Sequence, residues 1–65
     1  MVMSYEYKTK AVNLQQEDYH IPINLEMETK VDNVLNEMTM QGWEYLGASC
    51  PDRFWCLLFF RRIQK

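Results

Sequence analysis

The start of the chain alternates between two kinds of side chain, as a half-buried β-strand does. The odd positions carry aromatic or small residues, namely Tyr5, Tyr7, Thr9 and Ala11. The even positions carry Glu6, Lys8, Lys10 and Val12. We therefore predict a first strand over 5–12. From Asn13 to Asn24 the alternation is lost and polar residues dominate, which predicts a loop. Loops of this length are often functional, and disorder is the equally common alternative.

A helix is predicted after this loop, over 25–41. Its apolar residues recur at the spacing of a single helix face, and they are Met27, Val31, Val34, Leu35 and Met38. Asn24 is the expected N-cap, with Glu26 and Glu28 in the first turn, where the helix dipole favours acids. Gly42 is the residue expected to take the left-handed conformation that ends the helix.

Two further strands are predicted over 43–49 and 54–62, and Pro51-Asp52 between them has turn chemistry. They are expected to form an antiparallel hairpin, which gives the order β-α-β-β. The fold class is thus α+β, a three-stranded sheet containing antiparallel pairs, with one helix packed on one face. Trp43, just past the helix, is expected to be the core residue that locks the helix to the sheet.

The predicted third strand is apolar on both of its faces. Phe54, Cys56, Leu58 and Phe60 share one face, and Trp55, Leu57 and Phe59 share the other. In a sheet covered by one helix, a strand normally alternates between apolar and polar residues, because one face meets water. We therefore expect the uncovered face to pack against another copy of the chain, giving a homodimer or a homotetramer. The alternative is that the long loop, through Tyr19, Ile21, Pro22 and Ile23, folds over that face.

Size and composition support a folded domain that needs additional stabilisation. The 65 residues, 7.9 kDa in mass, form a single domain, 1–65, in which 48% of the residues are hydrophobic. A domain this short buries only about 60% of the surface of its unfolded chain. A disulfide, a metal or a partner chain is the usual supplement.

Of these supplements, a partner chain is favoured. Cys50 and Cys56 can face each other across the hairpin, but free, partly buried thiols in a reducing cytoplasm are the preferred interpretation. With one histidine, His20, and no closely spaced ligand pair, the chain has too few ligands for a metal site, and we expect no metal or cofactor. No apolar run approaches the about 18 residues of a membrane span. The start, Met1-Val2-Met3-Ser4, lacks the pattern of a leader, so we expect a cytoplasmic protein with no membrane partner.

Charge is sorted along the chain. Residues 17–44 have a balance of −6 and the remainder has a balance of +4, which together give the net charge of −2. The loop and helix are thus acidic, whereas the strands are basic and carry most of the aromatic residues. A net-negative domain lacks the broad basic footprint that extended nucleic acid requires, so we do not expect that partner.

A small phosphorylated nucleotide is a candidate ligand. Such a ligand needs cations for its phosphates and flat side chains for its bases. The candidate ligand-binding residues are Lys8, Lys10, Arg53, Arg61 and Trp55, with Tyr19 or His20 closing over the ligand from the loop. We expect them to act above all where two copies meet. The alternative is that the strand cations only blunt sheet edges and that His20 is an exposed loop residue.

An enzyme is not expected. Acid–base or nucleophilic catalysis needs groups within hydrogen-bond reach and usually a pocket. The sequence has no paired carboxylates on its strands, no Ser-His-Asp set and no glycine-rich phosphate loop, so we assign no catalytic residue.

Four short motifs resemble those of a known family. They are Tyr5-Glu6-Tyr7-Lys8, Leu35-Asn36-Glu37-Met38, Gln41-Gly42-Trp43-Glu44 and Phe59-Phe60-Arg61-Arg62. Together they resemble domain of unknown function family 4177, a family of short bacterial and phage proteins. The resemblance implies the β-α-β-β fold and an origin in small phage or bacterial genomes, and it implies no activity. The methionine-rich helix end and Tyr19-His20 in the loop depart from the family's pattern.

Two functions follow as expectations. Some phages encode very small oligomeric proteins that sequester the cyclic nucleotides by which bacteria signal infection, the anti-CBASS and anti-Thoeris sponges. A short oligomeric chain without catalytic groups looks like that class, and would act in the host cytoplasm. We therefore expect a non-enzymatic oligomeric binding protein, with nucleotide sequestration as its concrete form. The alternative is a protein–protein interaction module in which the apolar sheet face or Met40 docks a host or structural partner.

Overall fold

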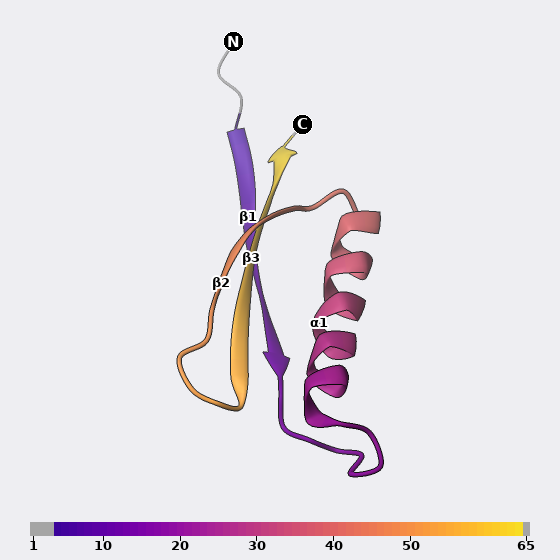
Figure 1. Ribbon diagram of the computed structural model, residues 1–65. Helices are drawn as coiled ribbons and strands as arrows, with labels where there is room; N and C mark the ends of the chain where they lie inside the picture. The colour runs from indigo at the N-terminus through magenta and orange to yellow at the C-terminus, as the bar shows by residue number, and fades with distance from the viewer. Residues whose placement is uncertain (1–3, 65) are drawn as a thin grey trace.

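The computed structural model describes residues 4–64 of the chain. Met1 to Met3 and Lys65 lie outside the described residues. The expectation about a leader concerned Met1 to Met3, and Lys65 is one of the bases counted above. In chain order the elements are β1 (Ser4–Asn13), α1 (Ile23–Met40), β2 (Glu44–Ser49) and β3 (Trp55–Gln64), as Figure 1 shows. The predicted order β-α-β-β is confirmed, and each element lies within two residues of its expected bounds.

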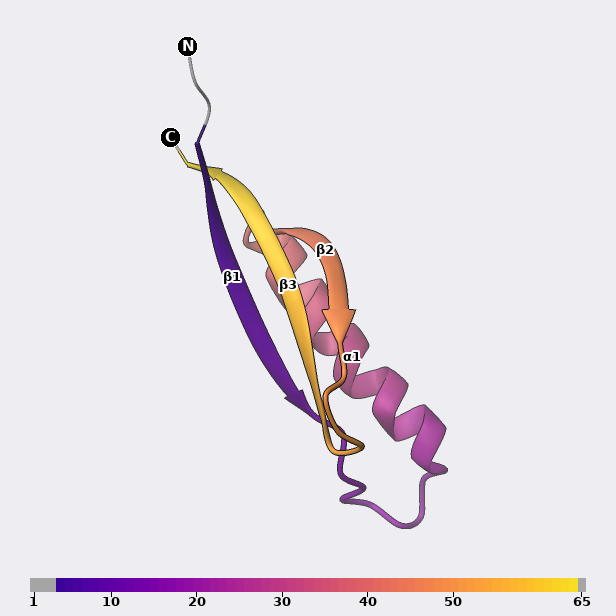
Figure 2. The same ribbon diagram turned by 90° about the vertical axis from the view of Figure 1, so that its left-hand side faces the viewer.

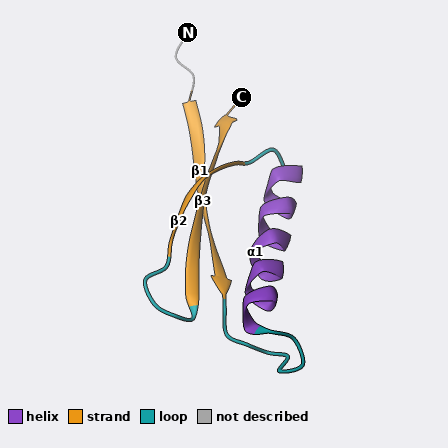
Figure 3. Cartoon of the chain, viewed as in Figure 1, coloured by secondary structure: helices purple, strands orange, loops and turns teal. Residues whose placement is uncertain are grey.

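The three strands form one antiparallel sheet in the order β1-β3-β2, so the last strand of the chain is the central one (Figure 3). β1 pairs with β3 over its full 10 residues. β2 is shorter and pairs only with 57–61 of β3, with a bulge between Tyr45 and Gly47. Both outer strands therefore support β3, and the predicted α+β class is confirmed.

α1 covers one face of this sheet only, as the two views in Figures 1 and 2 show. The side chains of β3 that face α1 are buried, and they are Cys56, Leu58 and Phe60. Met38 of α1 is buried against them, with Met27, Val31, Val34 and Leu35 packed around it. The predicted apolar stripe of the helix is thus confirmed. Val12, Leu14 and Trp43 complete the core.

The end of α1 is built as the sequence predicts. Gly42 has a φ of 88°, in the left-handed region. Its N–H donates to the Thr39 carbonyl at 3.0 Å, and the N–H of Trp43 donates to the Met38 carbonyl at 3.0 Å. This pair of bonds is a Schellman motif, which satisfies carbonyls that the end of a helix leaves free. It also delivers Trp43 into the core, where only 7% of the residue is exposed, as expected.

The start of α1 differs from the prediction. The helix begins at Ile23 with Pro22 at the N-cap and no side-chain cap, so the expected role of Asn24 is wrong. Pro22 has a φ of −53°, set by its ring, and its carbonyl already accepts the N–H groups of Leu25 and Glu26. Asn24 therefore lies inside the first turn. Of the two expected first-turn acids, only Glu26 is found there.

The loop 14–22 packs against α1. The Glu26 carboxylate accepts the backbone N–H of Glu17 at 2.8 Å. Lys30 Nζ donates to the Gln15 carbonyl at 2.7 Å. The loop therefore closes the end of the molecule between β1 and α1, as Figure 2 shows, and the structure does not adopt the alternative in which it covers the far face of the sheet.

Cys50 and Cys56 form a disulfide, so the expectation of free thiols is wrong. The turn between β2 and β3 brings their Cα atoms to 4.1 Å, well under the about 7 Å beyond which two cysteines cannot be bridged. Cys56 is also a member of the buried core. Part of the additional stabilisation that a short domain needs is thus covalent.

Arg62 connects the other end of β3 to neighbouring elements. It lies opposite Glu6 of β1, and its Nε donates to the Glu6 carboxylate. Its Nη1 donates to the Gln41 carbonyl at 3.2 Å, and its guanidinium carbon lies 4.2 Å from the centroid of the Trp43 ring. One side chain therefore joins β1, β3 and the end of α1.

The resulting molecule is long and thin. Its extents are 53 × 24 × 12 Å and its radius of gyration is 14.1 Å, whereas a compact chain of this length has about 11 Å. An elongated shape exposes more surface for each buried side chain. The core is accordingly a narrow seam between α1 and one face of the sheet.

Truncation of the central core residue tests this description. Phe60 is fully buried, so Phe60→Ala is expected to lower the free energy of unfolding by about 3–5 kcal/mol, the range for a buried aromatic. Denaturant unfolding followed by circular dichroism measures it. Met40→Ala, at a residue that is 88% exposed, is the control and is expected to change stability by less than about 0.5 kcal/mol. Equal losses in the two variants would contradict the assigned core.

Candidate interaction surface

The sheet face turned away from α1, called the open face below, is largely apolar. β3 contributes Trp55, Leu57, Phe59, Arg61 and Ile63, β1 contributes Tyr5, Tyr7, Thr9, Ala11 and Asn13, and β2 contributes Glu44, Gly47 and Ser49. These residues share a face because each lies directly opposite its neighbour in an antiparallel pairing. Tyr7 is 68% exposed, Ile63 49% and Trp55 43%. The prediction that β3 is apolar on both faces is thus confirmed, except for Phe54, which was expected on the face of Cys56 but precedes β3 and is 47% exposed.

In the middle of the open face, large side chains on β3 lie between smaller ones on the outer strands. One row across the three strands is Ala11, Leu57 and Ser49, and the next is Thr9, Phe59 and Gly47. A ridge of two large side chains on β3 therefore runs between smaller residues on both outer strands. The part of the chain that the structure describes contains no detectable pocket.

Arg61 is the cation of the open face and lies between the row of Thr9 and Phe59 and the row of Tyr5 and Ile63. Its Nε donates to the Glu44 carboxylate at 2.8 Å, and its guanidinium carbon lies 4.6 Å from the centroid of the Tyr5 ring. The hydrogen bond, and then the attraction between the charges, lowers the pKa of Glu44 below its ordinary value. The same two causes raise the pKa of Arg61. Both groups are therefore held charged, and the cation is already shared with a carboxylate of its own chain.

The candidate ligand-binding residues do not gather in one chain. Lys8 lies opposite Phe60 and Lys10 opposite Leu58, both of which face α1, so the two lysines are on the helix side of the sheet. The Lys8 ammonium lies 5.7 Å from the centroid of the Trp43 ring. Trp55 and Arg61, in contrast, are on the open face. The sheet therefore lies between the two lysines on one side and Trp55 and Arg61 on the other.

The remaining candidates lie outside the sheet. Tyr19 and His20 belong to the loop 14–22, and Arg53 belongs to the turn between β2 and β3. The His20 side chain is 99% exposed, and its Nδ1 lies 3.3 Å from the Asp18 carboxylate. This exposure agrees with the alternative interpretation of an exposed loop histidine.

Sequence reasoning missed two features that shape the surface. One is the contact of Arg62 with Glu6, which requires knowing that these two residues lie opposite each other. The other is the pair of hydrogen bonds that Asp52 accepts in the turn between β2 and β3, a turn that was itself predicted. Its signal was present in the sequence, because Asp52 stands two residues before Phe54 and an aspartate often bonds backbone N–H groups that follow it.

Among the residues that the structure describes, no cluster of three or more potential ligand side chains can hold a metal ion. None of the described segments forms a helix long and apolar enough to cross a membrane.

The ion pair on the open face makes a pH-dependent prediction. Because the pKa of Glu44 is lowered in the folded state, the pair stabilises the fold above the pKa of Glu44 in the unfolded chain, and this contribution is lost as the pH falls through the folded pKa. In Arg61→Gln, the pKa of Glu44 is expected to rise toward its ordinary value. NMR titration of the Glu44 carboxyl measures it, with Arg53→Gln as the control. An unchanged pKa in Arg61→Gln would contradict the pairing.

No protein-family model, no curated protein and no solved structure matches this chain. The resemblance to domain of unknown function family 4177 therefore stays a prediction from the sequence. Any conclusion about function rests on the geometry described above.

Proposed function

We propose that this chain is a non-enzymatic protein–protein interaction module that works as a homo-oligomer, a dimer or a tetramer, assembled through its open face. The observation that carries the proposal is the apolar character of that face, with Trp55 and Tyr7 substantially exposed and the loop 14–22 bound elsewhere. Large exposed apolar patches on a folded domain mark contact surfaces.

The relief of the open face supports a second copy as its occupant. Leu57 and Phe59 form a ridge with smaller residues on both sides. In a twofold dimer, the ridge of one copy lies against the smaller residues of the other copy, since each copy carries both. Two sheets packed in this way, about 10 Å apart, form the core of a β-sandwich.

Area and charge support the same arrangement. A stable interface buries about 800 Å² on each partner. Three aromatic residues of the open face keep exposed area that a second copy can bury, because Tyr7 is 68% exposed, Trp55 43% and Tyr5 37%. The ion pair between Arg61 and Glu44 is satisfied within one chain, so its burial leaves no unpaired charge.

Sequestration of a cyclic nucleotide is the second candidate function. The observation in its favour is that Trp55 and Arg61 share the open face. Twofold assembly doubles them, giving two flat rings and two cations. Lys8 and Lys10 take no part in this version because they lie on the helix side. The disulfide of Cys50 and Cys56 argues against the expected cytoplasmic location, since disulfides are rare in reducing compartments.

A charge placed on the ridge tests the assembly. Leu57→Glu and Tyr7→Glu are expected to convert the oligomer into a monomer, because a second copy would bury an unpaired carboxylate. Size-exclusion chromatography with light scattering measures the mass of each variant, and circular dichroism confirms that it is folded. Met40→Glu changes an equally apolar but exposed position on α1 and is expected to stay oligomeric. A wild-type monomer at micromolar concentration, or a Leu57→Glu variant of unchanged mass, would refute the proposal.

Calorimetric titration with cyclic GMP–AMP separates the two functions. If the open face binds nucleotides, Trp55→Ala is expected to lower the affinity about tenfold or more, since stacking on one base is worth about 1–3 kcal/mol. Lys8→Ala, on the opposite side of the sheet, is the matched control and is expected to bind as the wild type does. Absence of binding by the wild type would leave protein–protein interaction as the function.

A further inference from the structure

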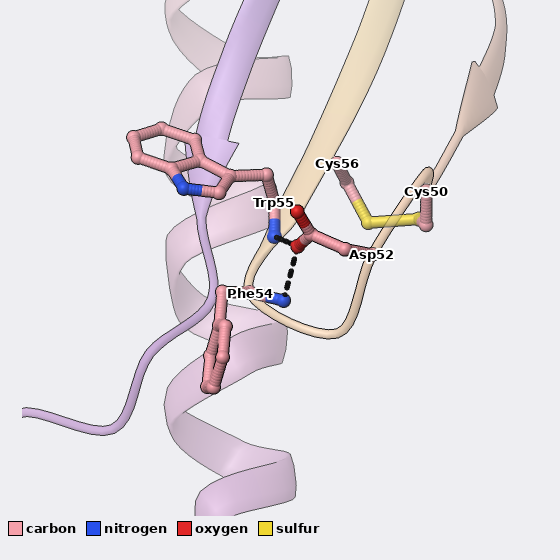
Figure 4. Close-up of a disulfide and its surroundings, with 5 residues drawn as sticks. All are labelled: Cys50, Asp52, Phe54, Trp55 and Cys56. Atoms are coloured by element: carbon pink, nitrogen blue, oxygen red, sulfur yellow. Dashed lines mark hydrogen bonds between the residues drawn. A yellow bond between two sulfur atoms is a disulfide. The ribbon is translucent and has the colours of Figure 1, made fainter.

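The turn between β2 and β3 is a closed loop that carries exposed aromatic and basic side chains. The disulfide of Cys50 and Cys56 joins its two ends, and Arg53, Phe54 and Trp55 stand between them. Figure 4 shows the disulfide on one side of this loop and the two aromatic rings on the other. The loop follows the short β2 and leads directly into the central strand.

The backbone of this loop is held at three points. The Asp52 carboxylate accepts the N–H of Phe54 at 2.7 Å and the N–H of Trp55 at 3.0 Å (Figure 4). The Phe54 carbonyl accepts the N–H of the buried Leu14 at 2.6 Å. Together with the disulfide, these bonds fix the path of the chain from Asp52 to the start of β3.

The side chains that this rigid backbone carries are not used by the core. Phe54 is 47% exposed, and Arg53 is exposed as well. The Arg53 guanidinium carbon lies 6.0 Å from the centroid of the Phe54 ring, so the cation and the ring are neighbours. Arg53 makes no ion pair with any residue in the range 4–64, in contrast to Arg61 and Arg62.

We propose that this disulfide-closed loop is a docking site for a protein partner whose surface has an apolar pocket beside a carboxylate. Phe54 fills the pocket, and Arg53 pairs with the acid through its planar guanidinium. Arginine and aromatic residues are the types that dominate binding energy at protein interfaces. The inference goes beyond the proposed assembly and uses other residues, because Arg53 and Phe54 precede β3, whereas the neighbouring Trp55 is the first residue of the open face.

Rigidity is the reason for assigning this role to the loop. A flexible turn loses conformational entropy when it binds, whereas a loop already fixed in its bound shape avoids most of that loss. The two bonds from Asp52 and the disulfide provide this fixed shape. Opening the disulfide leaves the residue types unchanged and removes part of the constraint, so reduction is expected to weaken binding. Circular dichroism of the reduced protein separates this effect from loss of the fold.

A library of short random peptides displayed on phage, selected against the immobilised oxidised protein, tests the proposal. Selected peptides are expected to combine Asp or Glu with neighbouring large apolar residues. Phe54→Ala and Arg53→Glu are expected to lower the affinity for the selected peptides about tenfold or more, the scale of a truncated hot spot. Reduction of the disulfide is expected to lower it as well.

The control is Tyr19→Ala, which removes an aromatic residue that is 81% exposed on the other loop and is expected to leave the affinity unchanged. The mass of the assembly, measured in parallel, is expected to be the same in Phe54→Ala and the wild type, which keeps this test separate from that of the open face. The proposal is overturned if no peptide is enriched, if the enriched peptides lack acids, or if they bind Phe54→Ala as tightly as the wild type.

Discussion

The structure depends on one constraint: the central strand is apolar on both faces, and the chain has a single helix to cover it. Cys56, Leu58 and Phe60 satisfy one side by packing under α1. Leu57 and Phe59 on the other side are half-buried, and smaller residues of the neighbouring strands lie opposite them. The burial that stabilises the monomer and the surface that remains open thus come from the same strand, through the alternation of its side chains.

The contacts outside the core hold this strand at its two ends. At its start, the disulfide and the Asp52 carboxylate fix the turn from β2. Near its end, Arg62 binds β1 through Glu6 and the end of α1 through Gln41. In a thin molecule with a narrow core, such clamps limit fraying of the β1–β3 ribbon where β2 no longer accompanies it.

The sequence predicts what depends on local spacing. The stripe of α1, its end at Gly42 and the two apolar faces of β3 followed from intervals along the chain. It does not predict what depends on which residues lie opposite each other, because a shift of one residue in strand register turns every side chain to the other face. Lys8 and Trp55 were therefore grouped as one site, whereas the register of β1 on β3 places them on opposite sides. The contact of Arg62 with Glu6 was missed for the same reason. The disulfide of Cys50 and Cys56 was considered but not preferred, because a reducing cytoplasm was expected.

Native mass spectrometry of the wild-type protein tests the central claim most directly, because one spectrum reports the number of chains and any small molecule that they retain. A dimer or tetramer is the result that follows from an open face buried against a second copy. A mass increment that disappears on denaturation would further identify a bound ligand. A monomer at micromolar concentration would contradict the account, since the open face would then be exposed to water in the working protein.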